Sequence, residues 1–69
     1  MKRYYINKTK DTNGKNEVHT SECFWTSLTN NKEYLGEFKN AIDAVSYAKH
    51  VGYNSADGCK FCSPEAHSA

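Results

Sequence analysis

Two pairs of potential metal ligands stand far apart in the sequence. Cys59 and Cys62 are separated by two residues in "DGCKFCSPEAH". This spacing is typical of a zinc knuckle, in which a tight turn directs both sulfurs at one ion. His19 and Cys23 form a second pair, separated by three residues in "HTSEC". Because structural zinc takes four ligands in a tetrahedron, the two pairs together predict a closed Cys3His site that binds Zn²⁺.

Histidines elsewhere offer one alternative ligand. His67 follows Cys62 by five residues and competes with His19 for the fourth position. We favour His19, because a ligand on a strand is held in place before the metal binds, whereas a terminal segment usually frays. His50 lies near the end of a predicted helix, where we expect it to be solvated and to interact favourably with the helix dipole.

The cysteines allow two further interpretations. All three could be small buried core residues, but the segment around Cys59 and Cys62 is too polar to favour this. Alternatively, Cys59 and Cys62 could be a redox pair. A thioredoxin-type pair opens a helix after a strand, whereas this pair follows a predicted helix in a loop. Metal binding is therefore the leading hypothesis.

The length and composition of the chain set the class of protein. With 69 residues, 38% hydrophobic and 25% charged, we expect one folded domain, residues 1–69, whose small core needs an additional staple. No stretch approaches the roughly 20 apolar residues of a membrane span, and "MKRYYINK" lacks the apolar region of a secretory signal. We therefore expect a cytoplasmic monomer without membrane contact. The odd number of cysteines, 3, also argues against a disulfide framework.

Three short strands are predicted in the first 40 residues. Residues 3–7 and 17–20 alternate or are rich in aromatic and β-branched side chains, and a turn at Asn13-Gly14 would join them as a hairpin. Residues 33–38 form the third strand, in which Gly36 indicates a bulge or a close approach of backbone. We also expect "TSECFW" to turn into a short helix, which would bring His19 and Cys23 together.

A helix is predicted over residues 41–51. Asn40 can cap its start, Gly52 suits a left-handed stop, and Tyr53 can pack back on the last turn. Apolar residues recur at helical spacing and form one stripe, expected to pack on the sheet: Ala41, Ala44, Val45, Ala48 and Val51.

These elements predict an α+β fold. We expect a small, mostly antiparallel three-stranded sheet with one helix packed on it, stapled by the zinc site. Residues 54–69 contain almost no apolar residue except Phe61, so we expect the metal rather than burial to hold this segment.

The order of these features resembles a known zinc module. His-x-x-x-Cys, "YLGEF", the helix "NAIDAVSYAKHVGY" and Cys-x-x-Cys, over roughly residues 17–62, are similar to the amino-terminal zinc domain of Ada-type methyl-phosphotriester DNA repair proteins. Related modules occur in bacterial nucleases, which implies a bacterial source. In the Ada domain the first ligand is the cysteine that accepts the alkyl group. His19 stands there in this chain, so the resemblance implies a structural site rather than phosphotriester repair.

Charge and aromatic residues bear on the partner. The formal net charge is +1, and one zinc held by three thiolates would bring it to zero, which gives no general attraction to nucleic acid. The predicted hairpin is nevertheless locally basic and carries Tyr4 and Tyr5, an arrangement that can also track a single strand. Its basic residues are Lys2, Arg3, Lys8, Lys10 and Lys15. We expect Phe24 and Trp25 to shield the metal site and fill the end of the small core, or to anchor a protein partner if exposed.

The leading functional prediction is a small zinc-stabilised binding module with a structural metal, no enzymatic activity and an unidentified protein partner. Two alternatives stay open. One is a nucleic-acid-binding accessory protein that uses the basic hairpin. The other is a thiol-reactive redox or alkyl-accepting protein with Cys59 or Cys62 as nucleophile. The sequence contains no Ser-His-Asp set, carboxylate pair or Gly-rich phosphate loop that we can interpret as another chemistry.

Overall fold

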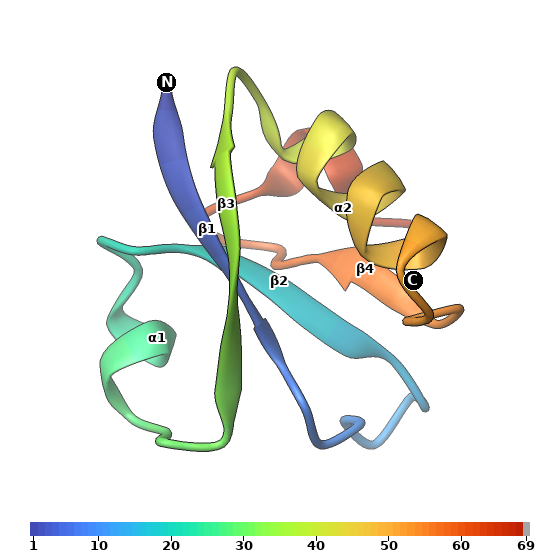
Figure 1. Cartoon of the computed structure of the whole chain (residues 1–69). Helices are drawn as coiled ribbons and strands as arrows, with labels where there is room; N and C mark the ends of the chain where they lie inside the picture. Colours follow the sequence, from blue (N-terminus) through green and yellow to red (C-terminus); the bar gives the residue numbers. More distant parts are fainter. Residues whose placement is uncertain (69) are drawn as a thin grey trace.

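The computed structural model describes residues 1–68 and consists of a four-stranded mixed sheet with α2 packed across one face (Figure 1). The strand order is β3-β1-β2-β4. The predicted α+β class is confirmed. The elements in chain order are β1 (Lys2–Asn7), β2 (Asn16–Thr20), α1 (Phe24–Ser27), β3 (Lys32–Phe38), α2 (Ala41–His50), β4 (Ala56–Gly58) and a 3-10 helix, η1 (Pro64–Ala66).

The predicted hairpin joins β1 and β2 as antiparallel neighbours. Asp11 organises the turn between them, because its Oδ1 accepts hydrogen bonds from the backbone N–H groups of Asn13 and Lys15, both at 2.9 Å. Gly14 has a φ of +76°, a left-handed conformation that suits glycine. The turn predicted at Asn13-Gly14 is confirmed.

A β-bulge interrupts the antiparallel pairing of β1 with β3. Tyr4 pairs with Gly36, whereas the next residue, Tyr5, pairs with Tyr34, so Leu35 is the extra residue on β3. The φ of +124° at Gly36 accommodates the change of register, as expected from the glycine in this strand. Leu35 is thereby buried against the core.

The sheet has one strand more than the sequence predicted. β4 pairs in parallel with β2, with Asn16 opposite Ala56 and Val18 opposite Gly58. Its three residues contain a single apolar side chain, so neither alternation nor β-propensity indicated a strand. The prediction of a three-stranded sheet was wrong in this respect.

The expectation that residues 54–69 escape burial is also wrong for the part of the segment that the structure describes; Ala69 lies outside the described residues. Ala56, Asp57, Cys59 and Ser63 are buried. The reason is tertiary, because α2 contacts both β4 and η1 and so covers this segment. Burial against the sheet therefore also contributes to holding this segment.

Two side chains cap the start of α2. Asn40 is the predicted cap, and its Oδ1 accepts a hydrogen bond from the Asp43 N–H at 2.9 Å. Glu65 adds a second cap from far along the chain, since its Oε2 accepts from the Ala41 N–H at 3.0 Å. The helix start is thus tied to the segment that follows the Cys59–Cys62 pair.

A Schellman motif ends α2. Gly52 has a φ of +119°, and the N–H of Tyr53 donates to the Ala48 carbonyl at 2.9 Å. Tyr53 thus folds back on the last turn, as predicted, and it also packs against the core. Four members of the predicted apolar stripe are buried, but Val51 at the cap is 47% exposed. Within residues 1–68 no helix has the length and hydrophobicity needed to cross a membrane.

Candidate metal centre

Four potential ligands from two distant parts of the chain meet beside the sheet. The ligand atoms of His19, Cys23, Cys59 and Cys62 all lie within 4.8 Å of one another. The Nδ1 atom of His19 is 3.6 Å from the Cys23 sulfur and 3.8 Å from the Cys62 sulfur. Bond lengths of about 2.3 Å to sulfur and 2.0 Å to nitrogen in a tetrahedron separate ligand atoms by roughly 3.5–3.8 Å. The cluster could therefore hold a metal ion.

The end of β2 and the turn after it position the first pair. Val18 is buried in the core on one face of the sheet, so strand alternation directs His19 to the other face. The Thr20 carbonyl then accepts hydrogen bonds from the Cys23 N–H at 3.1 Å and from the Thr26 hydroxyl at 2.6 Å. These bonds fold the chain into α1 directly after Cys23, as predicted for "TSECFW".

The second pair follows β4 in a tight turn. The N–H of Cys59 donates to the Val18 carbonyl at 2.9 Å, which continues the pairing of β4 with β2. The Cys59 carbonyl then accepts from the Ser63 N–H at 2.9 Å. A Cβ on Gly58 would lie 2.5 Å from the Ser63 carbonyl oxygen and 2.8 Å from the Ala66 Cβ. Glycine is thus required at position 58, because a larger residue would collide with the loop that packs against it.

The environment makes Cys62 the most acidic of the three thiols. Burial acts to raise the pKa of Cys62, but hydrogen bonds outweigh it and place the pKa below its usual value. The donors include the Ser63 hydroxyl and the backbone N–H of Thr20, which lies 3.4 Å from the sulfur. Such N–H···S contacts stabilise a metal-bound thiolate.

The other two thiols are held in their protonated form when no metal is bound. Burial, with a smaller contribution from the neighbouring Cys62, raises the pKa of Cys23 to about 11. Burial also raises the pKa of Cys59, although backbone hydrogen bonds from Cys62 and Phe61 oppose this. A metal ion must therefore displace protons from Cys23 and Cys59 when it binds.

His19 fits the role of a neutral ligand. It is 2% exposed, and burial lowers its pKa, so the imidazole is neutral at pH 7. Its Nε2 is buried without a hydrogen-bond partner in residues 1–68, and the Glu17 Oε1 lies 3.4 Å away. Binding a metal through Nδ1 would place the proton on Nε2, facing this carboxylate. The residues present thus fit a metal ion.

The structure separates the other two histidines from the cluster. The Nδ1 of His67 lies 3.0 Å from the Gly58 carbonyl and 3.4 Å from the Asp57 carboxylate. Ser68 also donates to Asp57, from its N–H at 3.0 Å and its hydroxyl at 2.9 Å. His67 therefore helps to fasten the chain end to β4. His50 is exposed on the last turn of α2, as expected.

Aromatic side chains beside the ligands point into solvent. Phe24 is 67% exposed, Trp25 46% and Phe61 74%. The rings of Phe24 and Trp25 meet edge to face at a centroid distance of 5.5 Å. The expectation that Phe24 and Trp25 fill the end of the core was wrong, because α1 is a single turn that turns its side chains outward and only Thr26 inward.

The predicted basic hairpin exposes lysines, but one of the two tyrosines expected beside them is buried. Lys8 and Lys10 are exposed near its turn. Tyr4, however, is one of the most deeply buried residues of the core. Its ring packs against Phe38 at a centroid distance of 6.2 Å and so has no face available for stacking on a base.

Comparisons of the chain with known protein families, curated proteins and solved structures found no match.

Proposed function

We propose that this chain is a small, non-catalytic binding module whose loops are fastened by one structural zinc ion. The observation that carries the proposal is the convergence of His19, Cys23, Cys59 and Cys62 within 4.8 Å. Four protein ligands complete a tetrahedron and leave no position for water or substrate, as in structural rather than catalytic zinc sites.

The ligand types support zinc over other metals. Three thiolates and one imidazole suit a borderline-soft ion in tetrahedral geometry, whereas calcium and magnesium prefer oxygen ligands. The neutral His19 and the hydrogen bond from Thr20 to the Cys62 sulfur match the protonation states that such a site requires.

Native mass spectrometry of the purified protein tests the proposal. We expect one zinc per chain in the parent, and loss of the zinc in Cys59→Ser, Cys62→Ser and His19→Ala. His67→Ala is the matched control, because His67 contacts Gly58 and Asp57 rather than the cluster. A parent that is folded and free of metal, or zinc loss in His67→Ala with retention in His19→Ala, would contradict the proposed site.

The partner surface we propose consists of Phe24, Trp25 and Phe61, which we call the aromatic face. Each residue lies within two positions of a predicted ligand in the sequence, and Trp25 and Phe61 line one shallow pocket together with Lys60. Large exposed aromatic side chains mark protein interaction sites more often than chance exposure. Because the ligands hold both loops, the metal would also fix the relative positions of these rings.

Affinity capture with paired variants tests this surface. A partner that binds the zinc-loaded parent should be lost in the double variant Phe24→Ser/Phe61→Ser, provided that the variant keeps its zinc. Leu28→Ser is the control, because Leu28 is exposed but does not line the pocket with Trp25 and Phe61. Equal capture by parent and double variant would exclude the aromatic face.

A thiol-reactive function is the second candidate, and the lowered pKa of Cys62 is the observation that favours it. In a thiol-reactive protein, Cys62 would react with iodoacetamide quickly and in the presence of zinc. In the structural site, all three thiols should react slowly until a chelator is added. Alkylation followed by mass spectrometry, with and without chelator, distinguishes the two functions.

A further inference from the structure

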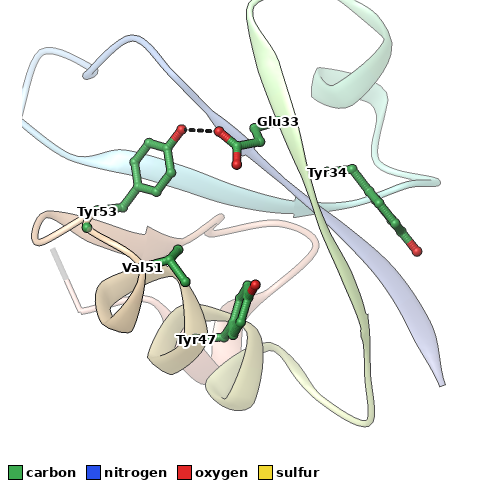
Figure 2. A pocket seen from close by; sticks show the side chains of 6 residues that line it. Glu33, Tyr34, Tyr47, Val51 and Tyr53 are labelled. Carbon is green, nitrogen blue, oxygen red and sulfur yellow. Dashed lines mark hydrogen bonds between the residues drawn. The ribbon is translucent and has the colours of Figure 1, made fainter.

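A groove of about 340 Å³ lies between the start of β3 and the end of α2, away from the metal cluster. Tyr47 from α2, Val51 and Gly52 at the helix end, and Tyr53 beyond it line one side. Glu33 and Tyr34 from β3 line the other side, and Figure 2 shows the Glu33 side chain reaching in while the Tyr34 ring points away. No residue of the metal cluster lines this groove.

The apolar part of the groove is held in a fixed shape but left open to solvent. Tyr47 and Val51 are one helical turn apart and are 42% and 47% exposed, although they adjoin the buried face of α2. The Tyr47 ring packs against Phe38 at a centroid distance of 5.5 Å. The Schellman motif fixes Tyr53 on the other side. Two aromatic rings therefore flank an aliphatic floor.

The groove also carries a negative charge without a counter-ion. The Tyr53 hydroxyl donates to the Glu33 Oε1 at 2.7 Å, as drawn in Figure 2. This bond orients the carboxylate and raises the pKa of Tyr53, as expected for a donor to an ionised acceptor. Within residues 1–68, none of the ion pairs found involves Glu33. Its second oxygen and further lone pairs remain available to a ligand.

We propose that this groove binds an arginine side chain presented by an exposed segment of a partner protein. The aliphatic stem of arginine would lie along Val51, and its planar guanidinium would stack on the tyrosine rings and donate to Glu33. This combination of aromatic faces, an apolar floor and an unpaired carboxylate matches arginine better than lysine, whose ammonium is more strongly hydrated.

The lining favours a peptide over the free amino acid. None of the groove residues is a lysine, arginine or histidine, so the α-carboxylate of free arginine would meet only Glu33 and uncharged side chains. A peptide has no such carboxylate at an internal arginine, and the open groove leaves room for its main chain to remain in solvent. The inference does not depend on the metal site or on the aromatic face.

Amide chemical-shift titration of the full chain tests the proposal. The probe is the blocked peptide Ac-Gly-Gly-Arg-Gly-Gly-NH2, and its matched controls carry lysine or the neutral isostere citrulline. Because the groove is shallow, we expect a dissociation constant on the order of 1 mM for the arginine peptide. Shifts should concentrate at Glu33, Tyr47 and residues 51–53. The lysine, citrulline and free-arginine probes should bind at least threefold more weakly.

Two variant pairs locate the binding site. Glu33→Gln should weaken the arginine peptide at least threefold, whereas Glu37→Gln, the same change on the same strand beside Arg3, should not. Tyr47→Leu should also weaken it, whereas Phe24→Leu, a comparable change at an exposed ring that does not line the groove, should not. A spectrum like that of the parent would show that each variant is folded. The proposal would be overturned if the citrulline peptide or free arginine bound as tightly as the arginine peptide. It would also be overturned if Glu33→Gln left the binding unchanged, or if the chemical shifts changed only on other surfaces.

Discussion

The backbone N–H of Thr20 donates to the sulfur of Cys62 at 3.4 Å, across 42 positions of sequence. This contact joins the end of β2 to the loop after β4. His19 directly precedes Thr20 in the chain, and Cys59 precedes Cys62 by three positions. The stability of the two loops is therefore coupled to the state of the Cys62 sulfur, which can accept this bond more strongly as a metal-bound thiolate.

Removal of the metal should loosen the end of the chain first. Structural zinc contributes about 10–16 kcal/mol of apparent binding energy in finger-sized peptides, against roughly 3–5 kcal/mol from a core of this size. We expect a chelator to lower the free energy of unfolding by several kcal/mol. Hydrogen exchange should show early loss of protection in residues 59–68, while β1, β3 and α2 retain more. Uniform loss over the whole chain, or none, would contradict this order.

Gly58→Ala should destabilise the protein and weaken zinc binding together. The added Cβ would lie 2.5 Å from the backbone oxygen of Ser63, which cannot move without displacing the loop that carries Cys62. Overpacking of this kind costs about 1–3 kcal/mol. Chemical denaturation of zinc-loaded protein measures the effect. Gly14→Asn is the control, because no atom would lie within 4 Å of its Cβ and asparagine tolerates the left-handed conformation.

Glu17→Gln should reduce zinc affinity while leaving one zinc per chain. Glu17 is the carboxylate nearest to the buried Nε2 of His19, at 3.4 Å, and a carboxylate there orients the ring and makes it a better ligand. Loss of such an outer partner typically costs 10–100-fold in metal affinity. Competition with a chromophoric chelator measures the zinc affinity of each variant. The control is Glu22→Gln beside Cys23, since Glu22 is exposed; an equal loss in both variants would point to net charge instead.

Zinc affinity should fall steeply as the pH is lowered. Cys23, with a pKa of about 11, and Cys59, whose pKa is also raised, are both protonated at neutral pH without metal, so each must release a proton on binding. The apparent association constant should therefore fall by about 100-fold or more for each pH unit between 8 and 7. Calorimetry in buffers of different ionisation enthalpy counts the protons. Release of fewer than two would show that the thiols are already ionised.

The bond between Tyr53 and Glu33 should add stability that is lost in alkali. The hydrogen bond to Glu33 raises the pKa of Tyr53 above 10.0, so its contribution is fully present below pH 10 and disappears as the pH rises through the folded value. Tyr53→Phe should cost at most about 1 kcal/mol at pH 8, because the pair is exposed, and less at pH 11. For Tyr34→Phe, whose hydroxyl makes no hydrogen bond within residues 1–68, we expect no pH-dependent difference.

Local sequence signals predicted the elements that depend on their own neighbours. The cap at Asn40 and the stop at Gly52 act within one helical turn, and the turn at Gly14 is closed by Asp11 three positions earlier. The spacing of the cysteines and of His19 indicated a metal site for the same reason, because ligand geometry within each pair is set by a few residues. These features could therefore be inferred without knowing what surrounds them.

Only the tertiary structure decided the features that need a distant partner. β4 is a strand because the edge of β2 is free to pair with it and α2 covers it, and its own three residues carry no such preference. The second cap of α2 comes from Glu65, and the need for glycine at position 58 comes from Ser63 and Ala66. Whether Phe24 and Trp25 were buried or exposed depended on which way a single helical turn faced the sheet. Burial and pairing that depend on a distant segment are properties of the packed molecule, and the local pattern at these positions did not indicate them.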